Sequence, residues 1–267
     1  MRWSGRPWRK GKDMRISDVT NYLDECFPKE NATDYDNIGF MAGEPDRAVT
    51  ACVLSLDLTG KAVERARQTG ADLIITHHPI IFGGIKTLST DTYKGRLLTS
   101  LIRSGISCYA CHTNLDMTDE FGNLAIASAL GAEDAVHLEG TDCGVVFEQE
   151  EGTLRDFVSK TQKALGASGV ITINDPDNKV KKVFAQGGSF DEESIPAIMA
   201  AGVDTVLSGE IKHHICVELE EYGINTVIAG HSATEQVYLQ KLSDKLSARF
   251  PSLHFIVNYN NEKASVI

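Results

Sequence analysis

The chain has 267 residues, of which 42% are hydrophobic and 24% are charged, with a formal net charge of −11. This composition is typical of a globular protein of one large or two modest domains and argues against a disordered chain. No apolar run is long enough to span a bilayer, and the negative charge disfavours binding to nucleic acid or to anionic membranes. We therefore expect a cytoplasmic protein whose six cysteines stay reduced.

The chain begins with a basic segment, residues 1–13, that contains both tryptophans. No apolar stretch of the kind found in secretory signals follows it, so we expect a disordered arm. From Met14 onward the hydrophobic residues Ile16, Val19 and Leu23 recur at helical spacing, which predicts the first helix.

Short apolar strands alternate with amphipathic helices from residue 49 to residue 229. This alternation is typical of α/β proteins with largely parallel sheets. In chain order it predicts a strand at 49–56, a helix at 59–68, a strand at 73–75, a helix at 93–104, a strand at 106–110, helices at 123–130 and 153–165, a strand at 180–185, a helix at 192–201, a strand at 205–207, a helix at 211–222 and a strand at 225–229.

A break at 131–142 interrupts the alternation and divides the chain into two parts of similar plan. We expect two α/β domains, each with a mixed, largely parallel sheet flanked by helices. The first domain is predicted at 14–130 and is completed by 231–267. The second is predicted at 131–230.

The first polar cluster, His77 and His78, follows the strand at 73–75 directly. Ligands of open α/β sheets gather at the carboxyl ends of strands. Neighbouring residues of an extended chain point to opposite sides, and Pro79 favours an extended His78, so one imidazole is available for each of two metal ions. The alternative is a pair of histidines in a solvent-facing loop.

Two further clusters follow later strands. His112 and Asp116 share one face if a helical turn follows the strand at 106–110, although Asp116 alone could cap a turn. His231 and Glu235 follow the strand at 225–229. Ser232 and Glu235 have the spacing of a capping box, so Glu235 could hold a helix start, bind metal, or do both.

Together the clusters offer imidazole nitrogens and carboxylate oxygens in the number that two metal ions need. Such ligands suit zinc, iron or manganese and do not distinguish among them. Two ions held close together need a bridging carboxylate, for which Glu235 is the candidate. The sequence thus predicts two divalent metal ions per chain, held by His77, His78, His112, Asp116, His231 and Glu235.

Three other patterns compete with this interpretation. Cys108, Cys111 and His112 match the C-x-x-C-H haem-attachment pattern, but they lie on a predicted buried strand, and no second C-x-x-C completes a zinc site. Glu210 and His213 have the spacing of a di-iron helix motif, of which such bundles need two copies. The roles of Glu210, Lys212, His213 and His214 stay open, with Lys212 a possible anion anchor. Residues 187–189, Gly-Gly-Ser, could cradle a phosphate or form only a turn.

The three clusters, read in full, resemble the signatures of the Nif-three-like dinuclear metal-centre family, whose members are often catalogued as GTP cyclohydrolase 1 type 2 homologues. The resemblance covers nearly everything after Met14. It is carried by Thr76-His77-His78-Pro79-Ile80-Ile81-Phe82, His112-Thr113-Asn114-Leu115-Asp116 and Gly230-His231-Ser232-Ala233-Thr234-Glu235, and extends through Asp36-Asn37-Ile38-Gly39, Leu54-Ser55-Leu56-Asp57 and Ser208-Gly209-Glu210-Ile211-Lys212-His213-His214.

This resemblance implies two α/β domains with a dimetal site in the cleft between them, and a toroidal homohexamer assembled from dimers. Two departures, Tyr35 in place of a common Trp and Ser232 in place of a frequent Tyr, leave the substrate preference open. The implied ligands are His77, His78, Asp116, His231 and a bridging Glu235, with His112 beside or among them.

The resemblance supports two functional hypotheses. In the first, the protein is a hydrolase acting on a small molecule, and metal-bound hydroxide opens the imidazole ring of a purine nucleotide such as GTP while His112 or His213 carries protons. In the second, it is a non-enzymatic metal-binding hexamer that acts in iron handling or as a protein-interaction platform. The sequence contains no unmistakable nucleotide-binding loop, which keeps the second hypothesis open.

Overall fold

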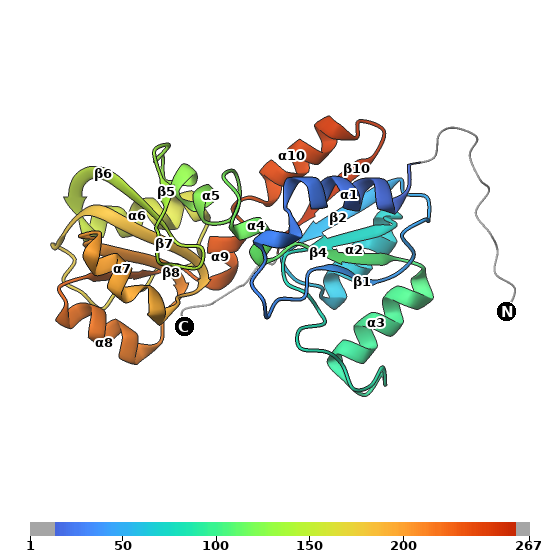
Figure 1. Cartoon of the computed structure of the whole chain (residues 1–267), viewed down its shortest axis with the longest axis horizontal. Helices are drawn as coiled ribbons and strands as arrows, with labels where there is room; N and C mark the ends of the chain where they lie inside the picture. The colour runs from blue at the N-terminus through green and yellow to red at the C-terminus, as the bar shows by residue number, and fades with distance from the viewer. Residues whose placement is uncertain (1–13, 260–267) are drawn as a thin grey trace, which may run out of the picture. The chain divides into compact units, whose positions relative to one another are not determined.

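The computed structural model describes residues 14–259, so the predicted basic arm at 1–13 lies outside the described residues. The described chain forms two compact units (Figure 1). Of the described residues, the first unit contains 14–29, 35–111 and 245–258, and the second contains 30–34, 112–244 and 259. Each unit is a sheet flanked by helices.

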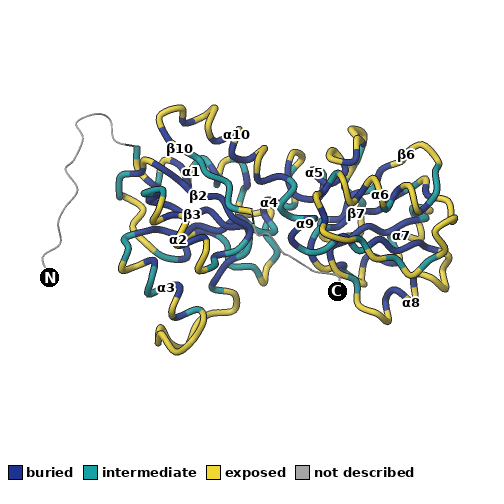
Figure 2. The backbone as a smooth tube through the Cα atoms, turned by 180° about the vertical axis from the view of Figure 1, so that it is seen from behind, coloured by how far each residue is buried: buried dark blue, intermediate teal, exposed yellow. Residues whose placement is uncertain are grey.

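The sheet of the first unit has the strand order β1-β4-β3-β2-β10. Its strands β2, β3, β4 and β10 run parallel, and β1 pairs with β4 antiparallel. All residues of β2, β3 and β4 are buried (Figure 2), which is usual for parallel strands covered on both faces. The strands are β1 (Gly39–Ala42), β2 (Ala51–Ser55), β3 (Leu73–Thr76), β4 (Ser107–Ala110) and β10 (His254–Asn258).

Helices cover both faces of this sheet. On one face α2 (Gly60–Thr69) and α3 (Tyr93–Ser104) share a core with Ile74 and its neighbours. On the other face lies α1 (Ile16–Cys26), whose Asp24 accepts a hydrogen bond from the hydroxyl of Tyr109. The short 3-10 turn η1 (Lys29–Asn31) follows α1.

The predicted helix at 93–104 is confirmed with the same bounds, because its ends are marked locally. The Thr92 hydroxyl accepts the N–H of Gly95, and Gly105, with φ of 62°, ends the helix in the left-handed region. Thr59 and Gly70 frame α2 in the same way. No helix among residues 14–259 combines the length and hydropathy needed to cross a membrane.

The sheet of the second unit has the order β5-β6-β7-β8-β9. The pairs β5–β6 and β6–β7 are antiparallel, while β7, β8 and β9 run parallel. The predicted α/β fold with two mixed sheets is therefore confirmed. The strands are β5 (Val136–His137), β6 (Val145–Thr153), β7 (Lys179–Ser189), β8 (Thr205–Glu210) and β9 (Asn225–Ile228).

Successive side chains of β7 point to opposite faces of the sheet. Val183 packs with α5 (Gly122–Ala129) and α6 (Leu154–Leu165), whereas Phe184 packs with α7 (Ile195–Ala200) and α8 (His213–Glu221). Burying a large apolar side chain contributes roughly 1.5–3 kcal/mol, so this alternation fixes which helices lie on each face. The remaining elements are η2 (Glu192–Ser194), α4 (Thr113–Asp116), α9 (His231–Glu235) and α10 (Leu239–Arg249).

The compact units divide the chain elsewhere than at the predicted boundaries. Helix α5, predicted within the first domain at 14–130, lies in the second unit because Ile126 and Ala127 share a core with Val183. Residues 231–244, predicted to complete the first domain, also lie in the second unit, and the chain re-enters the first unit within α10. The division into folding domains stays a prediction.

Candidate metal centre

In the first unit, His77 and His78 follow β3 with their backbones fixed to the end of β2. The His77 N–H lies 3.2 Å from the Ser55 carbonyl oxygen and 3.1 Å from that of Leu56, and the His78 N–H donates to Leu56 at 3.0 Å. The Thr76 hydroxyl donates to the His78 carbonyl at 2.9 Å. With His77 only 2% exposed and the His78 side chain 25% exposed, the two histidines are not a loose, solvent-facing pair.

The two imidazoles lie side by side, with ring centroids 4.9 Å apart. The expectation that they point to opposite sides is wrong, because the chain bends at His77 and His78 instead of continuing as a strand. Their Nδ1 atoms are held by oxygens, at 3.0 Å from the Cys111 carbonyl for His77 and at 2.8 Å from Asp57 Oδ1 for His78. A carbonyl oxygen only accepts, so His77 carries its proton on Nδ1 and presents the Nε2 lone pair.

In the second unit, His112 and Asp116 frame the one-turn helix α4. The His112 carbonyl accepts the N–H groups of Leu115 at 2.8 Å and Asp116 at 3.2 Å, which confirms the predicted helical turn. The chain then returns past Asp116 at Gly122, where φ is 54° and a Cβ would overlap the Asp116 backbone. Glycine at 122 therefore permits the close approach of these two segments.

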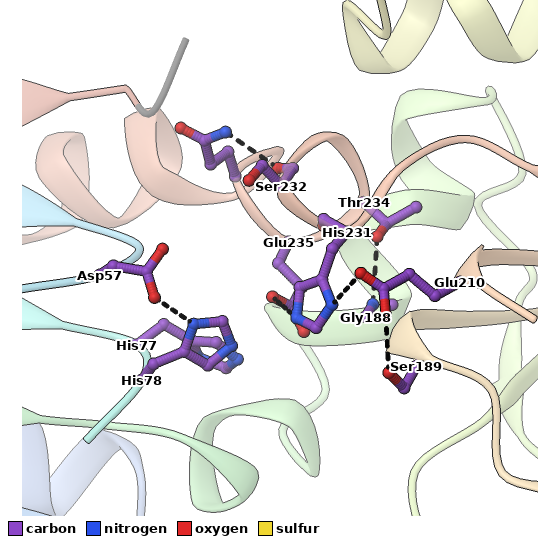
Figure 3. Close-up of polar contacts among 12 residues, drawn as sticks. Asp57, His77, His78, Gly188, Ser189, Glu210, His231, Ser232, Thr234 and Glu235 are labelled. Atoms are coloured by element: carbon purple, nitrogen blue, oxygen red, sulfur yellow. Dashed lines mark hydrogen bonds and ion pairs between the residues drawn. The ribbon is translucent and has the colours of Figure 1, made fainter. Parts of the chain in front are cut away.

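Helix α9 carries the second histidine–carboxylate pair. His231 Nε2 lies 3.0 Å from Glu235 Oε2, one helical turn away (Figure 3). The capping-box interpretation of Ser232 and Glu235 is wrong, because the N-cap residue is Gly230 and Ser232 lies within the helix. Glu235 therefore does not cap the start of this helix.

Gly187 and Gly188, at the end of β7, form the seat against which Glu235 lies. At Gly188, where φ is 63°, a Cβ would overlap Glu235 Oε1 and come within 3.2 Å of His231 Nε2. The N–H of Gly187 donates to Asn123 Oδ1 at 2.6 Å, and that of Gly188 donates to Thr234 Oγ1 at 3.1 Å. Both N–H groups are committed within the protein, so the phosphate-cradle interpretation is wrong.

Glu210 ends β8 and turns toward His231. Its Oε1 lies 3.3 Å from His231 Nδ1, and its Oε2 accepts the hydroxyl of Ser189 at 3.3 Å. Because Glu210 lies on a strand and His213 begins α8, the two do not share a helix face, and the di-iron interpretation is wrong. His213 is exposed.

Two residues that follow Glu210 in the chain, Lys212 and His214, both contact Glu192. His214 Nε2 lies 3.3 Å from Glu192 Oε2, and Lys212 Nζ lies 4.0 Å from Glu192 Oε1. The contacts of Asp57, Ser189 and Glu192 with these side chains were not predicted from the sequence. The position of Asp57, two residues after the end of β2, could have indicated its role.

The cysteines are free thiols, as expected. Burial raises the pKa of Cys108 to about 12, against a small opposing effect of the Thr76 hydroxyl. Burial, followed by the nearby Asp24 carboxylate, also raises the pKa of Cys111. Protonated buried thiols are poor metal ligands and poor sites of haem attachment, which supports the rejection of both alternatives.

The donor atoms in the two units suit a divalent ion that prefers nitrogen and oxygen. His77, His78 and His231 are held through Nδ1, so their Nε2 atoms can act as metal ligands. Glu235, which packs against Gly188, offers carboxylate oxygens. Zinc, iron and manganese bind such nitrogen and oxygen ligands. These residues fit a metal ion because of their ligand chemistry and because Gly188 leaves room for the Glu235 carboxylate. Candidate metal-binding residues are His77 and His78 in the first unit and His112, His231 and Glu235 in the second.

Known proteins similar to this chain are named after cyclohydrolases. A Clostridium perfringens protein named GTP cyclohydrolase 1 type 2 homolog is 29% identical over 253 residues, covering 92% of this chain and 96% of that protein. A Streptomyces coelicolor protein of the same name is 33% identical over 233 residues, covering 83% and 81%.

Solved structures share the fold. A Bacillus cereus protein related to NIF3 has a TM-score of 0.89 at 20% identity, covering 96% of this chain and all (100%) of that one. Reduced HcgD from Methanocaldococcus jannaschii has a TM-score of 0.79 at 27% identity, covering 92% and 98%. The family model for Duf34/NIF3 (NGG1p interacting factor 3) matches residues 14–263. The chain belongs to the Duf34/NIF3 family.

Proposed function

We propose that the protein is a dinuclear metal-dependent hydrolase. The proposed ligands are His77 and His78 from the first unit and Asp116, His231 and Glu235 from the second, with Glu235 bridging and His112 beside or among the ligands. Family membership and the nitrogen and oxygen donors at strand ends support this proposal.

The observation that carries the proposal is the seat of Glu235. Its side chain is only 11% exposed, its Oε2 lies 3.0 Å from His231 Nε2, and the missing side chain of Gly188 makes room for its Oε1. A largely desolvated carboxylate is costly unless a cation or strong donors compensate it. Two oxygens beside a nitrogen ligand are what a bridging carboxylate requires.

Two divalent ions, when bound, supply a water of lowered pKa and polarise a substrate oxygen. The chain's own residues then orient the substrate and move protons. We assign proton transfer to His112, which is half-buried at the start of α4, and to His213, which is exposed at the start of α8. The names of the similar proteins support a purine nucleotide such as GTP as the substrate class.

A non-enzymatic metal-binding homohexamer, acting in iron handling or as an interaction platform, is the second candidate. The N–H groups of Gly187 and Gly188 already donate hydrogen bonds within the protein, and Lys212 pairs with Glu192. These groups are therefore poorly placed to hold a triphosphate, which favours the second candidate. Molar-mass measurement in solution tests the hexamer.

The test of the dinuclear site compares Glu235→Gln with Glu192→Gln in the full chain. Both glutamates contact an imidazole Nε2, at 3.0 and 3.3 Å, but only Glu235 is proposed as a ligand. Elemental analysis should find two ions per wild-type and Glu192→Gln chain and fewer in Glu235→Gln. Two ions in Glu235→Gln would remove Glu235 from the site.

The test of the enzymatic reading incubates metal-loaded protein with GTP and with a panel of phosphoesters, followed by chromatography of the products. Turnover above that of the metal-free protein, and lost in Glu235→Gln, supports a hydrolase. Equal rates in metal-loaded and metal-free protein would favour the second candidate for these substrates.

A further inference from the structure

Each unit contains a carboxylate that contacts a histidine through Nδ1. We propose that Asp57 and Glu210 are positioning residues that hold the protons of His78 and His231 on Nδ1 and so direct each Nε2 toward a metal ion. This inference rests on the proposed function for its consequence, but its central claim concerns the tautomers of two histidines and can be tested without metal.

The sheet registers bring the partners together in the same way in both units. Ser55 of β2 pairs with Thr76 of β3, and two residues further along each strand come Asp57 and His78. Ser208 of β8 pairs with Ile228 of β9, and Glu210 and His231 follow two and three residues later. In both units a parallel strand therefore delivers an acid to the histidine that follows its neighbouring strand. The recurrence in two separate sheets is the observation that carries the proposal.

The second pair is extended by a third side chain (Figure 3). Ser189 donates to Glu210 Oε2 at 3.3 Å, which leaves Oε1 to face His231 Nδ1 at 3.3 Å. His231 Nε2 then faces Glu235. The row Ser189, Glu210, His231 and Glu235 thus runs from the end of β7 through the end of β8 to α9.

An ionised carboxylate only accepts hydrogen bonds, so a neutral imidazole beside it keeps its proton on the facing nitrogen. The opposite nitrogen then carries the lone pair that a metal ion needs. Asp57 lies 2.8 Å from its histidine and its side chain is 39% exposed, whereas Glu210 lies at 3.3 Å and is 62% exposed. We therefore expect the Asp57 pair to be the stronger.

Glu192 and His214 supply a matched control on the same edge of the second unit. Their contact is also a carboxylate–imidazole pair at 3.3 Å, but it uses Nε2, and both side chains are at least half exposed. Its loss should leave His78 and His231 unaffected.

The first measurement is the tautomer of each histidine, from nitrogen-15 NMR of the metal-free full chain at about pH 9, where imidazoles of ordinary pKa are neutral. Wild-type His78 should hold the proton on Nδ1, and Asp57→Ala should shift His78 alone toward the Nε2-protonated form. For His231, Glu235 Oε2 at 3.0 Å from Nε2 competes for the proton with Glu210 at 3.3 Å from Nδ1, so the measurement uses a Glu235→Ala background. In that background His231 should hold the proton on Nδ1, and adding Glu210→Ala should shift His231 alone toward the Nε2-protonated form. Glu192→Ala should shift neither. Unchanged tautomers in Asp57→Ala and Glu210→Ala would overturn the proposal.

The second measurement is metal affinity, from competition with a chromophoric chelator for zinc. Loss of a carboxylate that orients a histidine typically weakens binding 10- to 100-fold. We expect Asp57→Ala to reach the upper part of this range and Glu210→Ala the lower part, with the number of bound ions unchanged at saturation. A lower number of ions would make the acids ligands and overturn the positioning role. Wild-type protein that binds no zinc, iron or manganese would instead overturn the proposed function, while the tautomer result stands separately.

Discussion

Both units place a histidine beside a carboxylate at the carboxyl ends of neighbouring parallel strands, but they fix the histidine differently. In the first unit the backbone holds it, because the His78 N–H is bonded to the end of β2 and its carbonyl accepts the Thr76 hydroxyl. In the second unit a helix holds it, because His231 begins α9 and Thr234 ties that helix to β7.

Similar donor chemistry thus rests on unlike local structure in the two units. In the first arrangement backbone hydrogen bonds hold the main chain of His78, and the Asp57 side chain holds its ring. The second depends on Gly188 and Thr234, two residues that carry no metal donor in the proposed site. Substitutions in each unit can test this contrast.

Gly188→Ala should have the largest effect, since its methyl group would overlap Glu235 Oε1 and its φ of 63° strains any side chain. We expect about 1–3 kcal/mol of lost stability and the loss of bound metal. Gly166→Ala is the control, because Gly166 has φ of 64° and nothing within 4 Å of a Cβ. It should show the strain and keep its metal. Thermal unfolding and elemental analysis measure both effects, and equal metal content in the two variants would contradict the role of the seat.

Thr234→Val should destabilise the protein more than Thr76→Val. The Thr234 hydroxyl accepts the Gly188 N–H at 3.1 Å and donates to the His231 carbonyl at 2.8 Å, whereas that of Thr76 donates to the His78 carbonyl at 2.9 Å. Leaving a buried N–H without its acceptor costs about 1–3 kcal/mol, and losing an ordinary hydrogen bond costs about 1 kcal/mol. Urea denaturation should rank the variants in this order. The reverse order would contradict the contrast between the units.

The last effect develops only at alkaline pH and concerns a buried thiol of the first unit. Burial raises the pKa of Cys108 from 9.0 to about 12. Below pH 9.0 the thiol is protonated in both states, so its contribution to stability is complete there. Above it the unfolded chain loses the proton while the folded protein keeps it, and the free energy of unfolding falls until about pH 12. Cys108→Ala should lower stability near neutral pH but flatten this fall. An unchanged slope between pH 9.0 and 10.5, measured by urea denaturation, would contradict the shifted pKa.

Local patterns were enough to predict much of the fold. The helix at 93–104 is confirmed to the residue because its apolar spacing, Thr92 and Gly105 all act within a few residues. The three clusters at 77–78, 112–116 and 231–235 do follow strands β3, β4 and β9, since a strand's end can be recognised where an apolar run stops. The family resemblance is confirmed by the match over 14–263.

Other features depended on segments that are distant in sequence. Strands β1, β5, β6 and β10 were not predicted, and neither was helix α10. These strands are short, lie at a sheet edge or are only partly buried, so their apolar pattern is weak. The boundary between the compact units also depends on packing, because α5 joins whichever sheet accommodates Ile126.

The amino-acid sequence alone indicated which residues are candidates for metal binding, because imidazoles and carboxylates that follow apolar strands can be recognised without a structure. What the neighbours of these residues do depended on how the chain folds. Gly188 has no side chain and so leaves room for Glu235. Ser232 lies inside α9 instead of capping it. Glu210 faces His231 because two parallel strands share a register. Such roles arise from the approach of side chains that are tens of residues apart, and no local pattern of residues encodes that approach.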